Sequence, residues 1–376
     1  MSETEPGPGG LDVERTGRWL SATCGLRTPV TVTPVHGGRS NLTSVVEDAD
    51  GRRVVVRRPP LSGVLASAHD VEREGRIMAA LASTAVPVPE VLAVAGVDDE
   101  LGVPLLVTAH VDGTVVRDRP ASEALPATVR ARLTDPVAAT LATLHQVDVD
   151  AVGLGDLARR GGYLARQVAR WSRQLEGGGD RSVPELEELA AVLAASVAGG
   201  AGGAGGAAEE EVALVHGDYR LDNLIVDPEG GAVLAVLDWE LATLGDPLAD
   251  LATLLAYWGV PASADRPASV LHPALPTAVH GFAGPAELVA AYAGARGIDV
   301  DELGERLRPF LAFAWFRIAC ILEGVRVRTA SGAYGAVGRD AQEELLLLER
   351  SVPELARRAL GVLGRSGPVG FDHELI

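Results

Sequence analysis

Residues 214–240 read LVHGDYRLDNLIVDPEGGAVLAVLDWE and set two short apolar runs among a dense group of polar side chains. The runs Leu224–Val226 and Ala232–Leu237 predict two strands, and the turn residues Asp227–Gly231 between them predict a hairpin. Polar groups precede the first strand and follow the second. The hairpin is therefore expected to bring these two polar groups together.

Three of the polar residues have a spacing that indicates phosphate chemistry. Asp218 and Asn223 are five positions apart, as are the base and the metal-binding Asn of the kinase catalytic loop H-R-D-x-x-x-x-N. Asp238 follows the second strand, and we expect the hairpin to return it beside Asn223. An Asn carbonyl and a carboxylate are hard oxygen ligands that suit Mg²⁺. Asp218 is then free to accept a proton from an attacking hydroxyl.

A simpler interpretation exists for each of these residues taken alone. Asp and Asn are common in loops, where they form turns and helix caps. Asp246 and Pro247 are better explained as the N-cap and first residue of the next helix. Asp250, one turn further on, either braces the catalytic loop or is a solvated helix residue, and both alternatives stay open from the sequence.

Composition excludes several classes of protein. The net charge of −18 argues against sequence-independent binding to DNA or RNA, which depends on positive charge on the protein. No apolar run approaches the ~18 residues of a membrane span, the acidic N-terminus does not resemble a secretion signal, and the two cysteines form no metal or redox motif. We therefore expect a cytoplasmic protein with no nucleic-acid or membrane partner. All 33 basic residues are arginine, so any role that usually needs lysine must use another group.

Periodicity predicts a β-rich section followed by a mostly helical one. The expected strands are Val30–Pro34, Leu42–Glu47, Arg53–Arg57, Val91–Val94 and Pro104–Ala109, with a helix at Ala66–Leu81. The later helices are expected at Ser122–Leu133, Val137–Gln146, Gly161–Leu175, Pro184–Ala198, Pro247–Tyr257, Ala286–Ala295, Asp301–Arg328 and Asp340–Leu363.

This layout predicts a small lobe at 19–111 and a larger one at 112–363, between a flexible N-terminus (1–18) and a C-terminal tail (364–376). The stretch 199–208 satisfies G-x-G-x-x-G literally. However, a helix precedes it and a strand follows it, whereas the dinucleotide fingerprint needs the reverse. A flexible Gly/Ala-rich insertion is the better interpretation.

The motifs HGDYRLDN, LDWE and GDPLADLA resemble those of the aminoglycoside phosphotransferase-like branch of the protein-kinase-like fold, and the resemblance covers nearly the whole chain. It implies an α+β, two-lobed protein with a small antiparallel-sheet N-lobe and a larger helical C-lobe. It also implies an ATP-dependent phosphotransferase, with GTP as an alternative donor. By this resemblance Asp218 is the catalytic base, Asn223 and Asp238 hold Mg²⁺, and His216 ties the loop down.

The same resemblance assigns nucleotide contacts to the small lobe. The segment HGGRSN corresponds to the phosphate-covering loop, Arg57 takes the place of the usual lysine and pairs with Glu74, and TAHV is the hinge. Arg58 is expected to be a surface-strand arginine. The expected nucleotide-binding residues are Gly37, Gly38, Ser40, Asn41, Arg57, Glu74, Ala109 and Val111.

The acceptor is a small-molecule hydroxyl compound of unsettled identity. The segments VVVRRPP, DVERE and GYLARQVARW resemble the phosphotransferases related to acyl-CoA dehydrogenase fusion proteins, which implies a hydroxyacyl-CoA. Arg166 and Arg170 could meet its phosphates, or could be solvated beside a packed Trp171. The alternatives are an aminoglycoside kinase, a nucleotide-binding pseudokinase without transfer activity, and a metal hydrolase that does not use a nucleotide. The sequence does not indicate the oligomeric state.

Overall fold

The computed structural model describes residues 10–35, 41–59, 70–178, 181–198, 211–259, 275–331 and 339–364. The chain divides into two compact units. Unit 1 takes Met1–Thr114, Asp150–Leu154 and Leu234–Leu241, and unit 2 takes Val115–Val149, Gly155–Val233 and Ala242–Ile376. Each unit therefore contains segments that are far apart in the sequence.

Unit 1 is built on a five-stranded antiparallel sheet in the order β1-β2-β3-β5-β4. Side chains alternate between the two faces of a strand. Val54 and Val56 of β3 therefore belong to one buried cluster, while Arg57 points to the other face. The strands are β1 (Thr31–Pro34), β2 (Leu42–Glu47), β3 (Arg53–Arg58), β4 (Val91–Ala95) and β5 (Leu105–Ala109).

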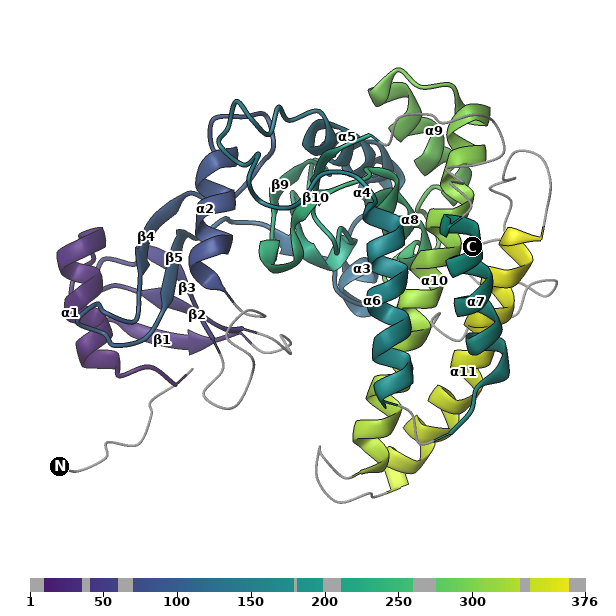
Figure 1. Ribbon diagram of the computed structural model, residues 1–376. Helices are drawn as coiled ribbons and strands as arrows, with labels where there is room; N and C mark the ends of the chain where they lie inside the picture. Colours follow the sequence, from purple (N-terminus) through teal and green to yellow (C-terminus); the bar gives the residue numbers. More distant parts are fainter. Residues whose placement is uncertain are drawn as a thin grey trace. The chain divides into compact units, whose positions relative to one another are not determined.

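Two helices cover the two faces of this sheet (Figure 1). Trp19 and Leu20 of α1 (Val13–Cys24) pack with Val54 and Val56 in one apolar cluster. Helix α2 (Val71–Leu81) approaches the opposite face so closely that a Cβ on Gly75 would lie 2.9–3.0 Å from side-chain atoms of β4 and β5. This close approach keeps α2 against the face that carries Arg57.

Helix α1 corrects the expectation of a flexible N-terminus through residue 18. Asp12 caps the helix by accepting the N–H of Arg15, and Gly25 ends it with a left-handed backbone at φ 70°. The mean hydropathy of the helix is low because only one face is apolar. That single face, with Trp19 and Leu20 buried, is enough to dock the helix on the sheet.

Arg58 also departs from the expectation of a surface arginine. Its side chain is buried and donates to the backbone carbonyls of Pro59 and Gly10. Because it directly follows Arg57 on β3, Arg58 lies on the other face of the strand. Burial lowers the pKa of its guanidinium.

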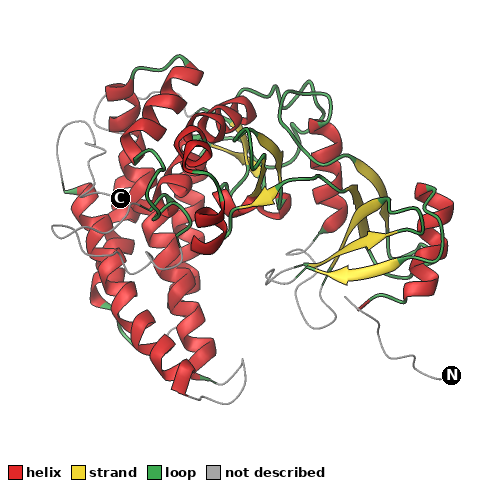
Figure 2. Cartoon of the chain, turned by 180° about the vertical axis from the view of Figure 1, so that it is seen from behind, coloured by secondary structure: helices red, strands yellow, loops and turns green. Residues whose placement is uncertain are grey.

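Unit 2 is mostly helical (Figure 2). None of the helices in the described part of the chain combines the length and the apolarity that a membrane span requires. Its helices are α3 (Arg119–Ala124), α4 (Ala127–Arg132), α5 (Thr134–His145), α6 (Tyr163–Gly178), α7 (Pro184–Ala198), α8 (Leu248–Tyr257), α9 (Pro285–Arg296), α10 (Val300–Ala330) and α11 (Arg339–Leu363).

The helix expected at Ser122–Leu133 is instead two helices, α3 and α4. Leu125 between them is extended, at φ −72° and ψ 141°. It precedes Pro126, whose ring disfavours a helical conformation in the residue before it. The other expected helices of unit 2 are present with shifts of a few residues at their ends.

Short strands of unit 2 frame the catalytic motif. β7 (Ala213–Val215) pairs antiparallel with β10 (Thr243–Gly245), and neither strand was expected from the sequence. β8 (Leu224–Val226) follows the motif. In the turn between β8 and β9 (Val233–Val236), the N–H of Asp227 donates a hydrogen bond to the carbonyl of Ala232. The chain therefore enters and leaves the motif through strands.

Candidate active site

Arg57 is the centre of a charged cluster in unit 1. Its guanidinium contacts Glu74 of α2 at 2.8 Å through one terminal nitrogen and Asp238 at 2.8 Å through the other. Glu240 lies 3.9 Å from the second nitrogen. We call Arg57, Glu74, Asp238 and Glu240 the Arg57 cluster. The expected pairing of Arg57 with Glu74 is thus present, and Asp238 joins it.

The Arg57 cluster has more negative than positive groups. Burial raises the pKa of Glu74 to about 7, although Arg57 acts to lower it. Burial acts to lower the pKa of Arg57, but the three carboxylates outweigh it and raise that pKa. Arg57 therefore stays charged, and three carboxyl groups share one guanidinium.

Asp238 is held in an unusual backbone conformation. It has φ 65°, and among the described residues no other non-glycine residue has positive φ. A left-handed residue with a side chain costs about 1 kcal/mol or more and persists only where its surroundings fix it. Two hydrogen bonds hold Asp238 and the strand before it in place. The N–H of Val236 donates to the carbonyl of Pro87, and Arg57 donates to the Asp238 carboxylate.

The other residues expected to bind nucleotide are placed as follows. Gly37, Gly38 and Ser40 lie outside the described residues. Asn41 is buried, and its amide nitrogen lies 3.4 Å from Glu240. Ala109 ends β5, where its N–H donates to the carbonyl of Glu90, and Val111 lies two residues further on.

The catalytic loop, residues 216–223, holds Asp218 and Asn223 together in unit 2. The Asn223 side-chain nitrogen donates to the Asp218 backbone carbonyl at 2.9 Å and lies 3.1 Å from its carboxylate oxygen Oδ2. These bonds orient the Asn223 amide so that its carbonyl oxygen is left as the acceptor end. Asp218 remains partly exposed, with 23% of its side-chain surface accessible.

Buried groups fix the backbone of the catalytic loop. Asp250 of α8 is fully buried and accepts the N–H groups of His216 at 2.6 Å and Gly217 at 2.8 Å. His216 Nδ1 accepts the N–H of Asp218 at 3.2 Å. Arg317 of α10 donates to the Gly217 carbonyl at 2.6 Å. Asp250 therefore braces the loop, and His216 ties it down as expected.

The electrostatics of Asp250 agree with this bracing role. Burial acts to raise its pKa, but the hydrogen bonds from His145 and from the His216 N–H outweigh burial and lower it. A carboxylate that accepts several N–H groups is favoured in its charged form. Asp250 is therefore ionised while it holds the loop.

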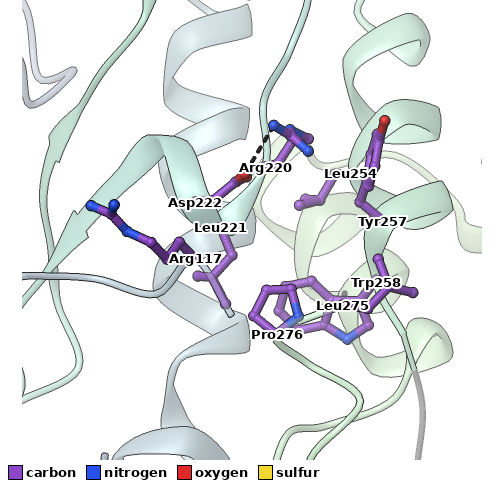
Figure 3. Close-up of a pocket in the computed structure, with 9 residues that line it drawn as sticks. All are labelled: Arg117, Arg220, Leu221, Asp222, Leu254, Tyr257, Trp258, Leu275 and Pro276. Carbon is purple, nitrogen blue, oxygen red and sulfur yellow. Dashed lines mark ion pairs between the residues drawn. The ribbon is translucent and has the colours of Figure 1, made fainter. Parts of the chain in front are cut away.

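Arg220 is a loop residue that the sequence analysis did not identify. Its guanidinium lies 3.3 Å from Asp218 and 2.8 Å from Asp222, and it stacks over the Tyr257 ring at 4.6 Å. A cavity of about 90 Å³ adjoins it (Figure 3). The cavity is lined by Arg117, Arg220, Leu221, Asp222, Leu254, Tyr257, Trp258, Leu275 and Pro276.

In helix α6, Arg166 has neither of its two expected roles, while Arg170 is exposed to solvent. Arg166 donates to the backbone carbonyls of Gly161 and Arg159, which precede the helix. The Arg317 guanidinium lies 6.0 Å from the centroid of the Trp171 ring. Arg166 thus ties down the start of α6, and Trp171 supports the arginine that holds the catalytic loop.

The expected metal ligands fall in different units, with Asn223 in unit 2 and Asp238 in unit 1. Within the described residues there is no cluster of three or more His, Cys, Asp or Glu side chains suited to a metal. Mg²⁺ needs only one or two such groups beside substrate phosphates and water. The carboxylate of Asp238 and the free carbonyl end of Asn223 have the donor chemistry that this ion takes.

The chain matches a family model and several known proteins. Residues 31–310 match the model of a family described as the phosphotransferase enzyme family. Acyl-CoA dehydrogenase family member 10 of Mus musculus is 35% identical over 334 residues, which are 87% of this chain and 29% of that protein. The chain thus spans less than a third of the length of that relative.

Solved structures share the architecture. A structure from Ralstonia eutropha JMP134, whose name places it with the aminoglycoside phosphotransferases, is 31% identical with a TM-score of 0.71 and covers 93% of this chain and 98% of its own. A thermostable mutant of aminoglycoside phosphotransferase APH(4)-Ia, in a ternary complex with AMP-PNP and hygromycin B, is 17% identical with a TM-score of 0.56, covering 91% and 97%. The predicted two-lobed, kinase-like α+β fold is confirmed.

Proposed function

Because the chain belongs to the phosphotransferase enzyme family, we propose that it transfers the γ-phosphoryl group of ATP to a hydroxyl group of a small molecule. The observation that carries this proposal is the catalytic loop, where Asn223 orients Asp218 by donating to its backbone carbonyl and its carboxylate. Asp218 then accepts the proton of the attacking hydroxyl. Most of the acceleration comes from positioning and charge neutralisation, since phosphoryl transfer leaves little covalent work to the protein.

We assign nucleotide binding to unit 1. A guanidinium can bind phosphate and carboxylate at once, so Arg57 keeps Glu74 while it meets the α- and β-phosphates. The N–H of Ala109 is already bonded to Glu90, which leaves its carbonyl for an adenine amino group. The N–H of Val111 is the matching donor in this proposal, and Gly37, Gly38, Ser40 and Asn41 approach the phosphates.

Asn223 and Asp238 are the proposed Mg²⁺ ligands. Their fit rests on donor chemistry, one carboxylate and one side-chain carbonyl. The bound ion neutralises charge on the β- and γ-phosphates. Asp238 would hold the ion through the carboxylate that accepts from Arg57, and Arg57 would supply positive charge to the phosphates.

We further propose a hydroxyacyl-CoA as the acceptor. The relative from Mus musculus is named for acyl-CoA chemistry. The cavity beside the catalytic loop is lined by six apolar or aromatic side chains together with Arg117, Arg220 and Asp222. The apolar side chains suit an acyl chain, and the two arginines suit the anionic phosphates of CoA. A polycationic aminoglycoside fits this lining less well.

The test is ADP release with Mg²⁺ and ATP against a panel of hydroxyacyl-CoAs and aminoglycosides, with a parallel series using GTP. We expect release with a hydroxyacyl-CoA to be about tenfold or more above the rate without acceptor, because a bound hydroxyl is held in position for attack. ADP release only with aminoglycosides would show that the protein is an aminoglycoside kinase and that a hydroxyacyl-CoA is not its acceptor. Thermal stabilisation by Mg²⁺ and ATP without release from any acceptor would indicate a pseudokinase, and turnover without nucleotide a metal hydrolase.

Asp238→Asn tests the metal assignment. We expect the Mg²⁺-dependent part of ATP affinity to fall by more than the roughly 10–100-fold that loss of an outer-shell partner costs. Asparagine is chosen because it tolerates the left-handed backbone at φ 65°. Isothermal titration with and without Mg²⁺ measures the effect. Asp50→Ala, which removes an exposed carboxylate in the same unit, is the control, and wild-type Mg²⁺ dependence in Asp238→Asn would exclude the ligand role.

A further inference from the structure

A line of polar side chains leads away from the catalytic loop through unit 2. Asp250, which holds the N–H groups of His216 and Gly217, also lies 3.3 Å from Nε2 of His145 at the end of α5. The other ring nitrogen of His145 lies 2.8 Å from the hydroxyl of Tyr292 on α9. His145, Asp250 and Tyr292 are all buried, so each of these bonds is shielded from water.

The line continues outward on α9. Arg296, one helical turn after Tyr292, donates to the Tyr292 hydroxyl at 2.9 Å and pairs with Glu211. The Arg296 side chain is 8% exposed, whereas 35% of the Glu211 side chain is exposed. The connected groups therefore run from the protein surface to the backbone of the catalytic loop. We call His145, Tyr292 and Arg296 the relay.

One arrangement of protons satisfies every bond of the relay while His145 stays neutral. Arg296 can only donate, so the Tyr292 oxygen accepts from it and donates its own proton to Nδ1 of His145. The ionised Asp250 can only accept, so His145 donates from Nε2. Burial lowers the pKa of His145, although Asp250 acts to raise it. A neutral His145 protonated on Nε2 fits every bond.

We propose that His145, Tyr292 and Arg296 are positioning residues for phosphoryl transfer, which orient the Asp250 carboxylate and through it the loop that carries Asp218. Oδ2 of Asp250 accepts hydrogen bonds from both His145 Nε2 and the His216 N–H. Without the donor on His145, this oxygen is free to rotate away from the loop. Gly217 then loses one of its two anchors and keeps only Arg317. The catalytic part of this proposal rests on the proposed function.

The first test removes one hydroxyl and follows backbone exchange. In Tyr292→Phe we expect hydrogen–deuterium exchange at the amides of His216 and Gly217 to become about tenfold faster, the effect of weakening one buried hydrogen bond. Exchange in the core of α10 is expected to stay as in the wild type. Ser351→Ala is the matched control, because it also removes a buried hydroxyl that donates to a backbone carbonyl in unit 2.

The second test separates positioning from packing. With the acceptor found by the ADP-release screen, Tyr292→Phe is expected to lower kcat about tenfold and leave KM for ATP unchanged. His145→Gln places an amide nitrogen where Nε2 donates, whereas His145→Asn places its amide near Nδ1. Gln is therefore expected to retain several-fold more kcat than Asn.

Three outcomes overturn the proposal. They are wild-type exchange at His216 and Gly217 in both Tyr292→Phe and His145→Asn, faster exchange throughout unit 2, and equal kcat in the two His145 variants. Exchange is measured without nucleotide or acceptor. If the wild-type protein releases no ADP with any acceptor, the proposed function fails, while the exchange result still shows whether the relay orders the loop.

Discussion

Asp218→Asn is expected to lower kcat for phosphoryl transfer about 10²–10⁴-fold, the range that a positioned general base contributes. The reason is that an amide in place of the carboxylate cannot take the proton of the attacking hydroxyl. Affinity for Mg²⁺ and ATP is expected to stay nearly unchanged, because Asp218 is assigned no contact with the nucleotide. Steady-state kinetics with the acceptor and calorimetric titration with Mg²⁺ and ATP measure the two quantities separately.

Asp222→Asn is the matched comparison for this variant. Asp222 and Asp218 are similarly exposed, at 27% and 23%, and both lie against the Arg220 guanidinium. The difference between the two is the side-chain nitrogen of Asn223, which lies 3.1 Å from the Asp218 carboxylate. We therefore expect a much smaller fall in kcat for Asp222→Asn. Equal losses in the two variants would show that the charge around Arg220 matters and that Asp218 has no special role.

Arg57→Met is expected to lower the free energy of unfolding by about 3–5 kcal/mol, the cost of leaving one partner of a buried ion pair uncompensated. Glu74 is 1% exposed and Arg57 15% exposed, so little solvent is available to replace the lost partner. Urea denaturation measures the change. Arg53→Met on the same strand is the control. The pair of Arg53 with Asp112 is exposed, and its loss should cost less than about 1 kcal/mol.

The penalty of Arg57→Met should depend on pH. In the wild type the pKa of Glu74 is raised from 4.5 to about 7, so its contribution to stability is present below pH 4.5 and is lost as the pH rises through about 7. Without Arg57 the pKa of Glu74 rises further, because Arg57 acts to lower it. The native state must then either bury an unpaired Glu74 carboxylate or take up a proton on it. The loss should therefore be larger at about pH 8.5 than at about pH 6.

Adding Glu74→Gln to Arg57→Met separates charge burial from packing. Glutamine keeps the size of the side chain and has no charge to leave unpaired. We expect the double variant to recover part of the lost stability and to show a flatter pH dependence. No recovery at either pH would mean that the destabilisation comes from lost packing of the arginine stem.

The Arg57–Glu74 pair could be predicted because it depends on short-range rules. Alternation along β3 sets the face of Arg57, and helical periodicity sets the face of Glu74. The spacing of Asp218 and Asn223 was readable for the same reason. Both belong to one short loop, where six residues of sequence contain the whole contact.

The groups that fix the catalytic loop could not be predicted in this way. Arg317 reaches Gly217 across 100 positions of sequence, and Tyr292 reaches His145 across 147. Nothing in the local pattern of α10 or α9 separates these residues from ordinary helix residues. Their role depends on how helices pack, and a single sequence carries no periodic signal for that packing.

Helix α1 was missed for a different reason. Its apolar face is only a few residues wide and follows a Pro- and Gly-rich segment, so composition suggested a loose end. The capping signals, Asp12 before the helix and Gly25 after it, were present in the sequence. The two capping residues, taken together with the apolar face, would have predicted the helix.

The arginine on β3 also determines which reagents can report on the protein. A guanidinium stays protonated at any pH at which the fold survives, and it is a poor nucleophile beside an amine. With no lysine anywhere in the chain, acylating probes that label kinases through a side-chain amine have no target on this strand. Dicarbonyl reagents directed at arginine are the chemistry that would label Arg57, and the carboxylates of Glu74 and Asp238, each 2.8 Å from its guanidinium, would shield it from them.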